Sequence, residues 1–342
     1  MKNRIYLDDW LVMKPYEKQT ASDNFYLKIC NDVKKTLIAA KHFNSFQSYL
    51  SNEEIDSLCC FLTSYFEDLM SETNIWNSFI RKHHELYKKY LPFYELEDYY
   101  DNEINKQDIS FLIWYYLSAY LDGEEINAES HFIIHTADQV FDLFEKTWDV
   151  APSNVHLKSF YQLDDKEDNF YIVRNLIDLT FLSTYLFYPD TRVRIQESAQ
   201  NFILNPDKEE IDDEQFVSQY NELRDNNLFE MHTRLLGLSG KEWVSEILGK
   251  NHVLGTSIRE ISPKVTSVFL YKGQDEDNLF LEHIATGIPF EVIKKSYEKS
   301  HLLTEIDAIV YMGIVRWKNE WWFSGLSMQL EHNHDSIMME KQ

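Results

Sequence analysis

The chain has 342 residues, of which 44% are hydrophobic and 15% aromatic, and this excludes a disordered tail and predicts two domains. Its formal net charge is -24. Lys and Arg count 13 against 33 Asp and Glu between residues 91 and 260, and this strongly acidic field argues against general binding to nucleic acid or to an anionic membrane surface.

Helical periodicity runs through the first 260 residues. Residues 1–20 are expected to form an arm that docks on the rest of the chain. From Ser22 onward, apolar residues recur at helical spacing and predict a helix with Lys34 and Lys35 on its solvent side. Ser51 with Glu54, and Ser239 with Glu242, have the spacing of capping boxes and predict helix starts. Residues 1–260 are therefore expected to form an all-helical domain of about 8–10 helices.

The stretch from Asp108 to Leu121 is apolar or aromatic almost all round. A helix with no polar face is stable in water only when other elements cover it. We expect this helix at the centre of the helical domain, with Asp108 as its N-cap.

The pattern changes after Pro263. Short runs rich in branched and aromatic residues are separated by turn residues, and they predict strands at Val265–Lys272, Leu279–Ile284, Ile288–Ile293, Ile306–Trp317 and Trp321–Ser327. Short connections favour a small antiparallel five-stranded barrel of SH3 or OB size over residues 261–330. The fold class expected is α+β, with a flexible tail at residues 331–342.

Several motifs carry a family resemblance. They are Ile5-Tyr-Leu-Asp-Asp-Trp-Leu11, Phe111-Leu-Ile-Trp114, Trp148-Asp-Val-Ala-Pro-Ser-Asn154 and Leu235-Leu-Gly-Leu-Ser-Gly-Lys-Glu-Trp243. In these the chain resembles an uncharacterised family of Bacteroidetes proteins, the domain of unknown function numbered 3843. The C-terminal residues are similar to a small β module found in other uncharacterised bacterial proteins. The resemblance implies a helical intracellular protein and transfers no active-site residue.

Cysteine usage and the N-terminus both favour the cytoplasm. Cys30, Cys59 and Cys60 cannot all pair, so reduced thiols are the simplest interpretation. Asp8 and Asp9 interrupt any apolar signal segment, and the central apolar run is shorter than the roughly 18 residues of a membrane span. We expect a cytoplasmic protein with no membrane partner.

His131 and His135 are one helical turn apart, and Asp138 continues near the same face. Two imidazoles at this spacing can share a divalent metal, which a carboxylate could help to hold. A polar helix edge is the competing interpretation, because a closed site needs about four ligands. The sequence therefore gives a metal-dependent enzyme of the hydrolase class only as an alternative.

The barrel segment carries a surplus of aromatic side chains. A surface built from Tyr271, Trp317, Trp321 and Trp322 with Arg316 at its edge could contact a partner. Successive side chains of a strand point to opposite faces, so one of Trp321 and Trp322 is expected inside and the other free. Nucleic acid is the third possibility, but residues 261–330 hold seven basic against nine acidic side chains.

No complete catalytic constellation and no cofactor motif occurs in the sequence. The leading prediction is a non-enzymatic protein that contacts an unknown protein or peptide partner through the barrel.

Overall fold

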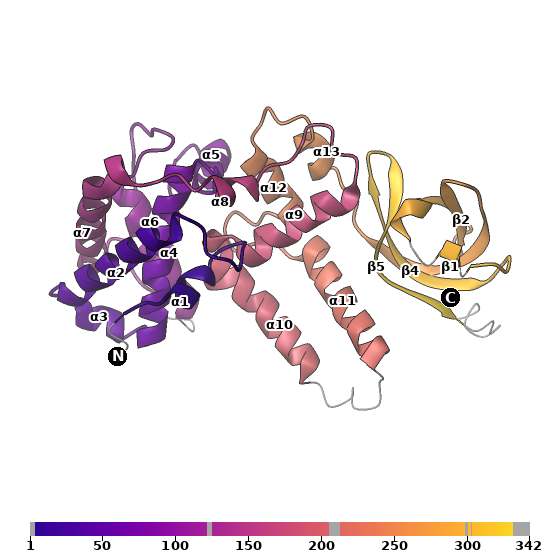
Figure 1. Ribbon diagram of the computed structural model, residues 1–342, viewed down its shortest axis with the longest axis horizontal. Helices are drawn as coiled ribbons and strands as arrows, with labels where there is room; N and C mark the ends of the chain where they lie inside the picture. Colours follow the sequence, from indigo (N-terminus) through magenta and orange to yellow (C-terminus); the bar gives the residue numbers. More distant parts are fainter. Residues whose placement is uncertain (1–3, 122–124, 205–212, 298–299, 302, 331–342) are drawn as a thin grey trace.

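The computed structural model describes residues 4–121, 125–204, 213–297, 300–301 and 303–330. A helical body leads into a closed β-barrel, so the predicted α+β fold is confirmed (Figure 1). The described residues contain thirteen α-helices rather than 8–10, and four of the thirteen have only five residues. The predicted tail at residues 331–342 lies outside the described residues.

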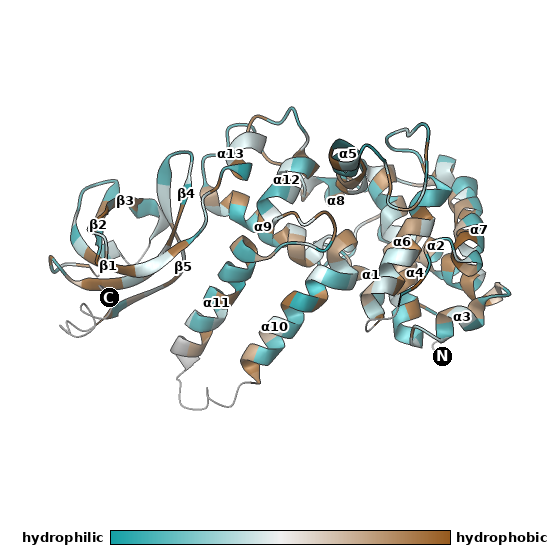
Figure 2. Cartoon of the chain, turned by 180° about the vertical axis from the view of Figure 1, so that it is seen from behind, coloured by the Kyte–Doolittle hydropathy of each residue, from teal (hydrophilic) through white to brown (hydrophobic). Residues whose placement is uncertain are grey.

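The helices follow one another through the body, with short helical turns between some of them. Their bounds are α1 Leu7–Leu11, α2 Asp23–Ala39, α3 Phe43–Gln47, α4 Asn52–Ser71, α5 Ile75–Tyr87, α6 Lys106–Tyr120, α7 His131–Thr147, α8 Val155–Ser159, α9 Phe170–Ser183, α10 Val193–Ile203, α11 Asp213–Glu230, α12 Gly240–Leu248 and α13 Gly255–Arg259. Both predicted capping boxes are present, at the starts of α4 and α12. Helices α10 and α11 extend away from the rest as a pair, and α11 is largely hydrophilic (Figure 2).

Helices α4 and α6 supply the centre of the body. Phe61, Tyr65, Tyr115 and Tyr116 are almost fully buried there, in one apolar cluster that also takes in Trp10 of the N-terminal arm. The predicted burial of α6 is correct for most of its length, whereas Trp114 and the last turn are half-buried. Among the described residues, no helix combines the length and the apolar character that crossing a membrane requires.

Two sequence expectations about charged residues in the body are wrong. Asp108 is not the N-cap of α6, because the helix begins two residues earlier and Asn105 takes the cap position. Asp108 is fully buried and accepts hydrogen bonds from Tyr65 and Trp76, among others. Lys34 is 2% exposed rather than on the solvent side, because its ammonium group pairs with Asp56 on α4 at 2.6 Å.

The barrel contains five strands in the spatial order β1-β2-β3-β5-β4. Their bounds are β1 Val265–Gln274, β2 Asn278–His283, β3 Pro289–Ile293, β4 Ile309–Trp317 and β5 Glu320–Leu330. Four strand pairs are antiparallel as predicted, but β3 and β5 run parallel. Because β3 and β5 are joined by a single residue pair, Val292 with Trp321, the barrel is closed by its shortest ladder at that place.

Candidate functional site

Apolar side chains join the barrel to the helical body. Trp317 and Trp322, each 1% exposed, pack with Phe170 of α9, whose ring centroid lies 6.2 Å and 5.8 Å from theirs. Val315 and Ile258 belong to the same cluster. Aromatic burial of this size is a major source of binding energy between two elements. The two tryptophans therefore hold the barrel against α9.

A buried ionic network fixes α11 against the last strand. The carboxylate of Asp225 is fully buried and lies 2.6 Å from the Arg174 guanidinium and 2.8 Å from the Lys264 ammonium. Lys264 also pairs with Glu222 at 2.7 Å, and Ser324 of β5 donates a hydrogen bond to Asp225. Charges removed from water are stable only when they are fully paired, so this network requires α9, α11 and β5 to stay together.

Gly325 allows β5 to come close to α11. Its φ is +86°, and a Cβ built there would lie 2.3 Å from the Glu222 carboxylate and 2.5 Å from the Lys264 ammonium. The neighbouring amide of Leu326 donates to Glu222 at 2.8 Å. A larger residue at position 325 would meet both a strained backbone and these buried charges.

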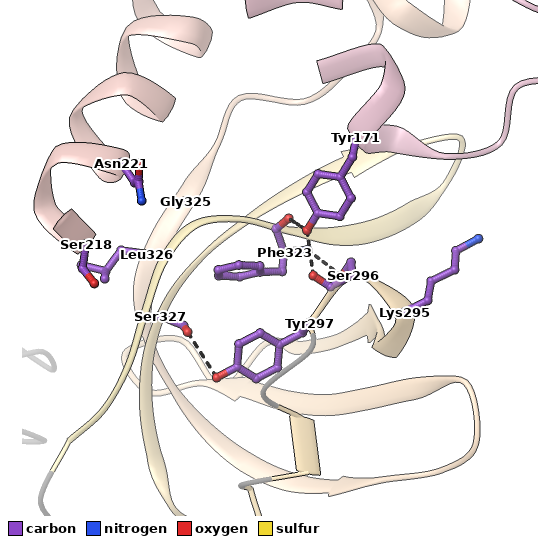
Figure 3. A pocket seen from close by; sticks show the side chains of 10 residues that line it. All are labelled: Tyr171, Ser218, Asn221, Lys295, Ser296, Tyr297, Phe323, Gly325, Leu326 and Ser327. Carbon is purple, nitrogen blue, oxygen red and sulfur yellow. Dashed lines mark hydrogen bonds between the residues drawn. The ribbon is translucent and has the colours of Figure 1, made fainter. Parts of the chain in front are cut away.

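A groove of about 480 Å³ opens beside this contact (Figure 3). Its walls come from four segments that are distant in the sequence: the start of α9, the face of α11, the turn after β3, and β5. The lining residues are Tyr171, Ser218, Asn221, Lys295, Ser296, Tyr297, Phe323, Gly325, Leu326 and Ser327. Most of these side chains are polar or aromatic, which suits a site that combines hydrogen bonds with stacking.

Hydrogen bonds hold the walls of the groove in place. The Tyr171 hydroxyl lies 2.7 and 2.8 Å from the carbonyl oxygens of Ser296 and Phe323, which share its one proton (Figure 3). The Phe323 amide donates to the Ser296 hydroxyl at 3.0 Å, and the Ser327 hydroxyl donates to that of Tyr297 at 3.2 Å. The groove is therefore organised before any ligand enters it.

One edge of β5 faces the groove. On its other edge β5 pairs with β4 along most of its length, from Glu320 to Leu330. On the groove side, the only strand pair among the described residues is Trp321 with Val292. The backbone groups of Phe323 bond to the side chains of Ser296 and Tyr171, and the Leu326 amide bonds to Glu222. A strand edge that no other strand covers is a template for an added strand.

The structure places most of the predicted aromatic surface inside the protein. Trp317 and Trp322 lie in the seam, and Tyr271, 3% exposed, lies in the barrel core. Trp321 is half-buried and packs edge-on against Phe290, with ring centroids 5.0 Å apart. Arg316 is exposed and donates to the Asn319 side chain. Trp322 is therefore the inside member of the pair, and Trp321 is partly accessible rather than fully exposed.

The structure adds a third histidine to the predicted pair. His42 lies with its ring centroid 5.0 Å from that of His131 and 6.0 Å from that of His135. The Asp138 carboxylate pairs with Lys106 at 3.1 Å. Within the described ranges, no three or more His, Cys, Asp or Glu side chains are arranged so that they could hold a metal ion.

The cysteines are poorly suited to nucleophilic chemistry. Cys30, Cys59 and Cys60 are buried and form no disulfide. Burial raises the pKa of Cys30 and of Cys59 well above the ordinary thiol value. A protonated, enclosed thiol is a weak nucleophile, so these residues serve the core.

The fold and the groove define a two-part protein, in which a helical body carries a small β-barrel on its C-terminal side. The family model for Protein of unknown function (DUF3843) matches residues 4–282, and the chain belongs to this family. The matched region crosses the junction near residue 260 and ends within β2. No curated protein and no solved structure matches the chain.

Sequence reasoning did not find the groove. Tyr171, Ser218 and Asn221 look like ordinary polar or aromatic positions of surface helices. They become neighbours of β5 only because α9 and α11 pack against the barrel. The surplus of aromatic residues did indicate this region, although only Trp317 and Trp322 of the predicted set form the seam beside the groove.

Proposed function

We propose that the protein binds an extended segment of a partner protein in the groove between β5 and α11. The segment would lie along the groove-facing edge of β5 and add a strand to the barrel. Main-chain hydrogen bonds would supply affinity, and the aromatic and hydroxyl groups of the lining would select side chains. The protein would then act as a non-enzymatic interaction module.

The observation that carries this proposal is the edge of β5. The strand has eleven residues, yet its groove-side ladder with another described strand is one residue pair long. Beyond that pair, Phe323, Gly325, Leu326 and Ser327 of β5 line a hollow of about 480 Å³, which is within the range of ligand sites. A long strand edge beside a preformed hollow is the geometry that strand addition uses.

The charges near the groove favour an uncharged or mixed segment over a nucleic acid. Lys295 is the lining cation, and its ammonium group lies 4.8 Å from the centre of the Trp322 ring. Lys264 is occupied by Glu222 and Asp225. A polynucleotide needs a continuous basic footprint, which this surface and the net charge of -24 do not offer.

A peptide-display selection on the full chain, followed by fluorescence polarisation of the enriched peptides, tests the proposal. Ser218→Trp fills the groove from the α11 side, and Val217→Trp, at a neighbouring exposed position outside the lining, is the matched control. We expect Ser218→Trp to weaken binding about tenfold or more, since it blocks the path of the segment, and Val217→Trp to leave binding within about twofold. Equal binding to both variants, or failure to enrich any peptide, would overturn the proposal.

A further inference from the structure

A second hollow, of about 250 Å³, lies in the helical body, away from the groove. Aromatic rings form most of its wall, and they come from α5, α6 and the loop between them. The lining residues are Phe79, His83, Tyr87, Pro92, Phe93, Phe111, Trp114, Tyr115, Ser118, Arg234, Leu235 and Leu236. The hollow exceeds the roughly 150 Å³ that encloses benzene, so it can take a small aromatic compound with one polar group.

The rings of the wall form a continuous surface. The Phe79 and Phe111 rings are nearly parallel, with centroids 5.3 Å apart, and the Phe93 ring meets the Trp114 ring edge-on at 4.6 Å. Phe111 and Tyr115 are parallel within 3° at 6.1 Å. Flat walls of this kind favour a flat ligand, because offset stacking and edge-to-face contact both need a planar partner.

Two of the wall residues have strained backbones. Phe93 has φ +68° and Leu236 has φ +60°. Large apolar side chains rarely adopt this region, and the other described non-glycine residues with positive φ are polar or charged. Strained residues of this type cluster at ligand-binding sites, where the surrounding structure holds them. Phe93 is also 55% exposed, so its aromatic ring is accessible at the rim of the hollow.

Two polar groups of the lining, on Tyr115 and Arg234, are hydrogen-bond donors. The Tyr115 hydroxyl is buried and has no hydrogen-bond partner among the described residues. Burial raises the pKa of Tyr115, and the nearby Asp190 carboxylate raises it further, so this hydroxyl keeps its proton and can donate it. Arg234, exposed at the rim, donates one hydrogen bond to the Ser118 carbonyl at 3.3 Å. The lining contains no Asp or Glu, and the nearest carboxylate that acts on both Tyr115 and Arg234 is that of Asp190, behind the wall.

Hydrogen bonds of Thr233 and Trp243 hold the loop that carries Arg234. The Thr233 hydroxyl lies against the carbonyl oxygens of Leu235 and Leu238, and the Trp243 indole N–H donates to that hydroxyl at 2.7 Å. Arg234 and Leu236 are therefore presented by a fixed turn rather than by a free loop.

We propose that this aromatic hollow binds a small aromatic carboxylate, with its ring between Phe111 and Phe93 and its carboxylate toward the Tyr115 hydroxyl and the Arg234 guanidinium. The planar ring of the ligand would stack on the aromatic side chains of the wall. The carboxylate satisfies a buried donor that otherwise has no partner, and charge-assisted hydrogen bonds of this kind are stronger than neutral ones. This site is separate from the β5 groove, and neither proposal depends on the other.

Three probes on the unmodified chain give the first test. Titration calorimetry compares phenylacetate, its neutral amide phenylacetamide, and cyclohexylacetate, which keeps the charge and lacks the flat ring. We expect phenylacetate to bind about tenfold more tightly than either of the others. Equal affinity for phenylacetate and phenylacetamide, or no saturable binding of phenylacetate, would overturn the proposal.

Substitutions then locate the site. Tyr115→Phe removes only the hydroxyl, and Tyr100→Phe makes the same change at a residue that is 63% exposed and outside the lining. We expect Tyr115→Phe to weaken phenylacetate binding about tenfold and Tyr100→Phe to leave it within about twofold. Arg234→Leu should remove the preference for phenylacetate over phenylacetamide, while unchanged melting temperatures show that the variants are folded. Binding that is the same in all of them contradicts this assignment.

Discussion

Replacing Asp108 with Asn removes a carboxylate from the centre of the helical body while keeping its shape. One carboxylate oxygen accepts hydrogen bonds from the Tyr65 hydroxyl at 2.8 Å, the Trp76 indole at 2.9 Å and the Tyr99 hydroxyl at 2.7 Å. The side chain is completely buried. Burial raises the pKa of Asp108 to about 7, and these hydrogen bonds lower it only in part.

The direction of the pH dependence follows from this raised pKa. An unfolded Asp titrates near pH 3.9, so between about pH 4 and 7 the folded state holds a proton that the unfolded state releases. The resulting stabilisation is complete below about pH 4 and is lost as the pH rises through 7. For a gap of about 3 pKa units, the free energy of unfolding loses about 2–3 kcal/mol from this group between pH 5 and 8.

Urea unfolding followed by tryptophan fluorescence measures this effect. The free energy of unfolding is determined between pH 5 and 8 for the unmodified chain and for Asp108→Asn, which cannot titrate. The unmodified chain should lose about 2–3 kcal/mol relative to Asp108→Asn as the pH rises over this range. Asp149→Asn, at an exposed position, is the matched control. A difference that stays constant with pH, or moves in the opposite direction, would refute the reasoning.

The remaining predictions concern the seam and the histidines. Trp322→Ala should lower the free energy of unfolding by about 3–5 kcal/mol, because it empties a buried site between α9 and the barrel, and urea titration checks it. Asp225→Ala should cost about 3–5 kcal/mol in the same assay because it removes the buried carboxylate that pairs with both Arg174 and Lys264, so a loss below about 1 kcal/mol contradicts the network. A metal site at His131 and His135 requires a stoichiometric metal in elemental analysis of untagged protein, and the absence of stoichiometric Zn, Mn or Fe would end that alternative.

Local signals in the sequence predicted the elements well. The capping boxes at Ser51 and Ser239 act within four residues, so the sequence contains all their partners. The alternation after Pro263 likewise predicted five strands, since burial on one face of a strand has a period of two. Their spatial order was beyond such signals, because the parallel contact of β3 with β5 depends on how the barrel closes.

The predictions for charged residues were wrong where the partners of those residues are distant in the sequence. Lys34 reads as a solvent-exposed residue until α4 brings Asp56 to it, and Asp108 reads as a cap until α4 and α5 supply its donors. The groove has the same origin. It exists because α11 meets β5 through Glu222 and Gly325, residues that nothing in the sequence links.

Hydrogen exchange tests the proposed strand addition most directly. The full chain is compared alone and with a peptide enriched against it, and amide exchange is followed by mass spectrometry along the whole sequence. The account predicts that the peptide slows exchange in residues 327–330 of β5, because the groove-side amides beyond Leu326, which already donates to Glu222, gain main-chain partners. Protection confined to the helical body, with β5 unchanged, would contradict it.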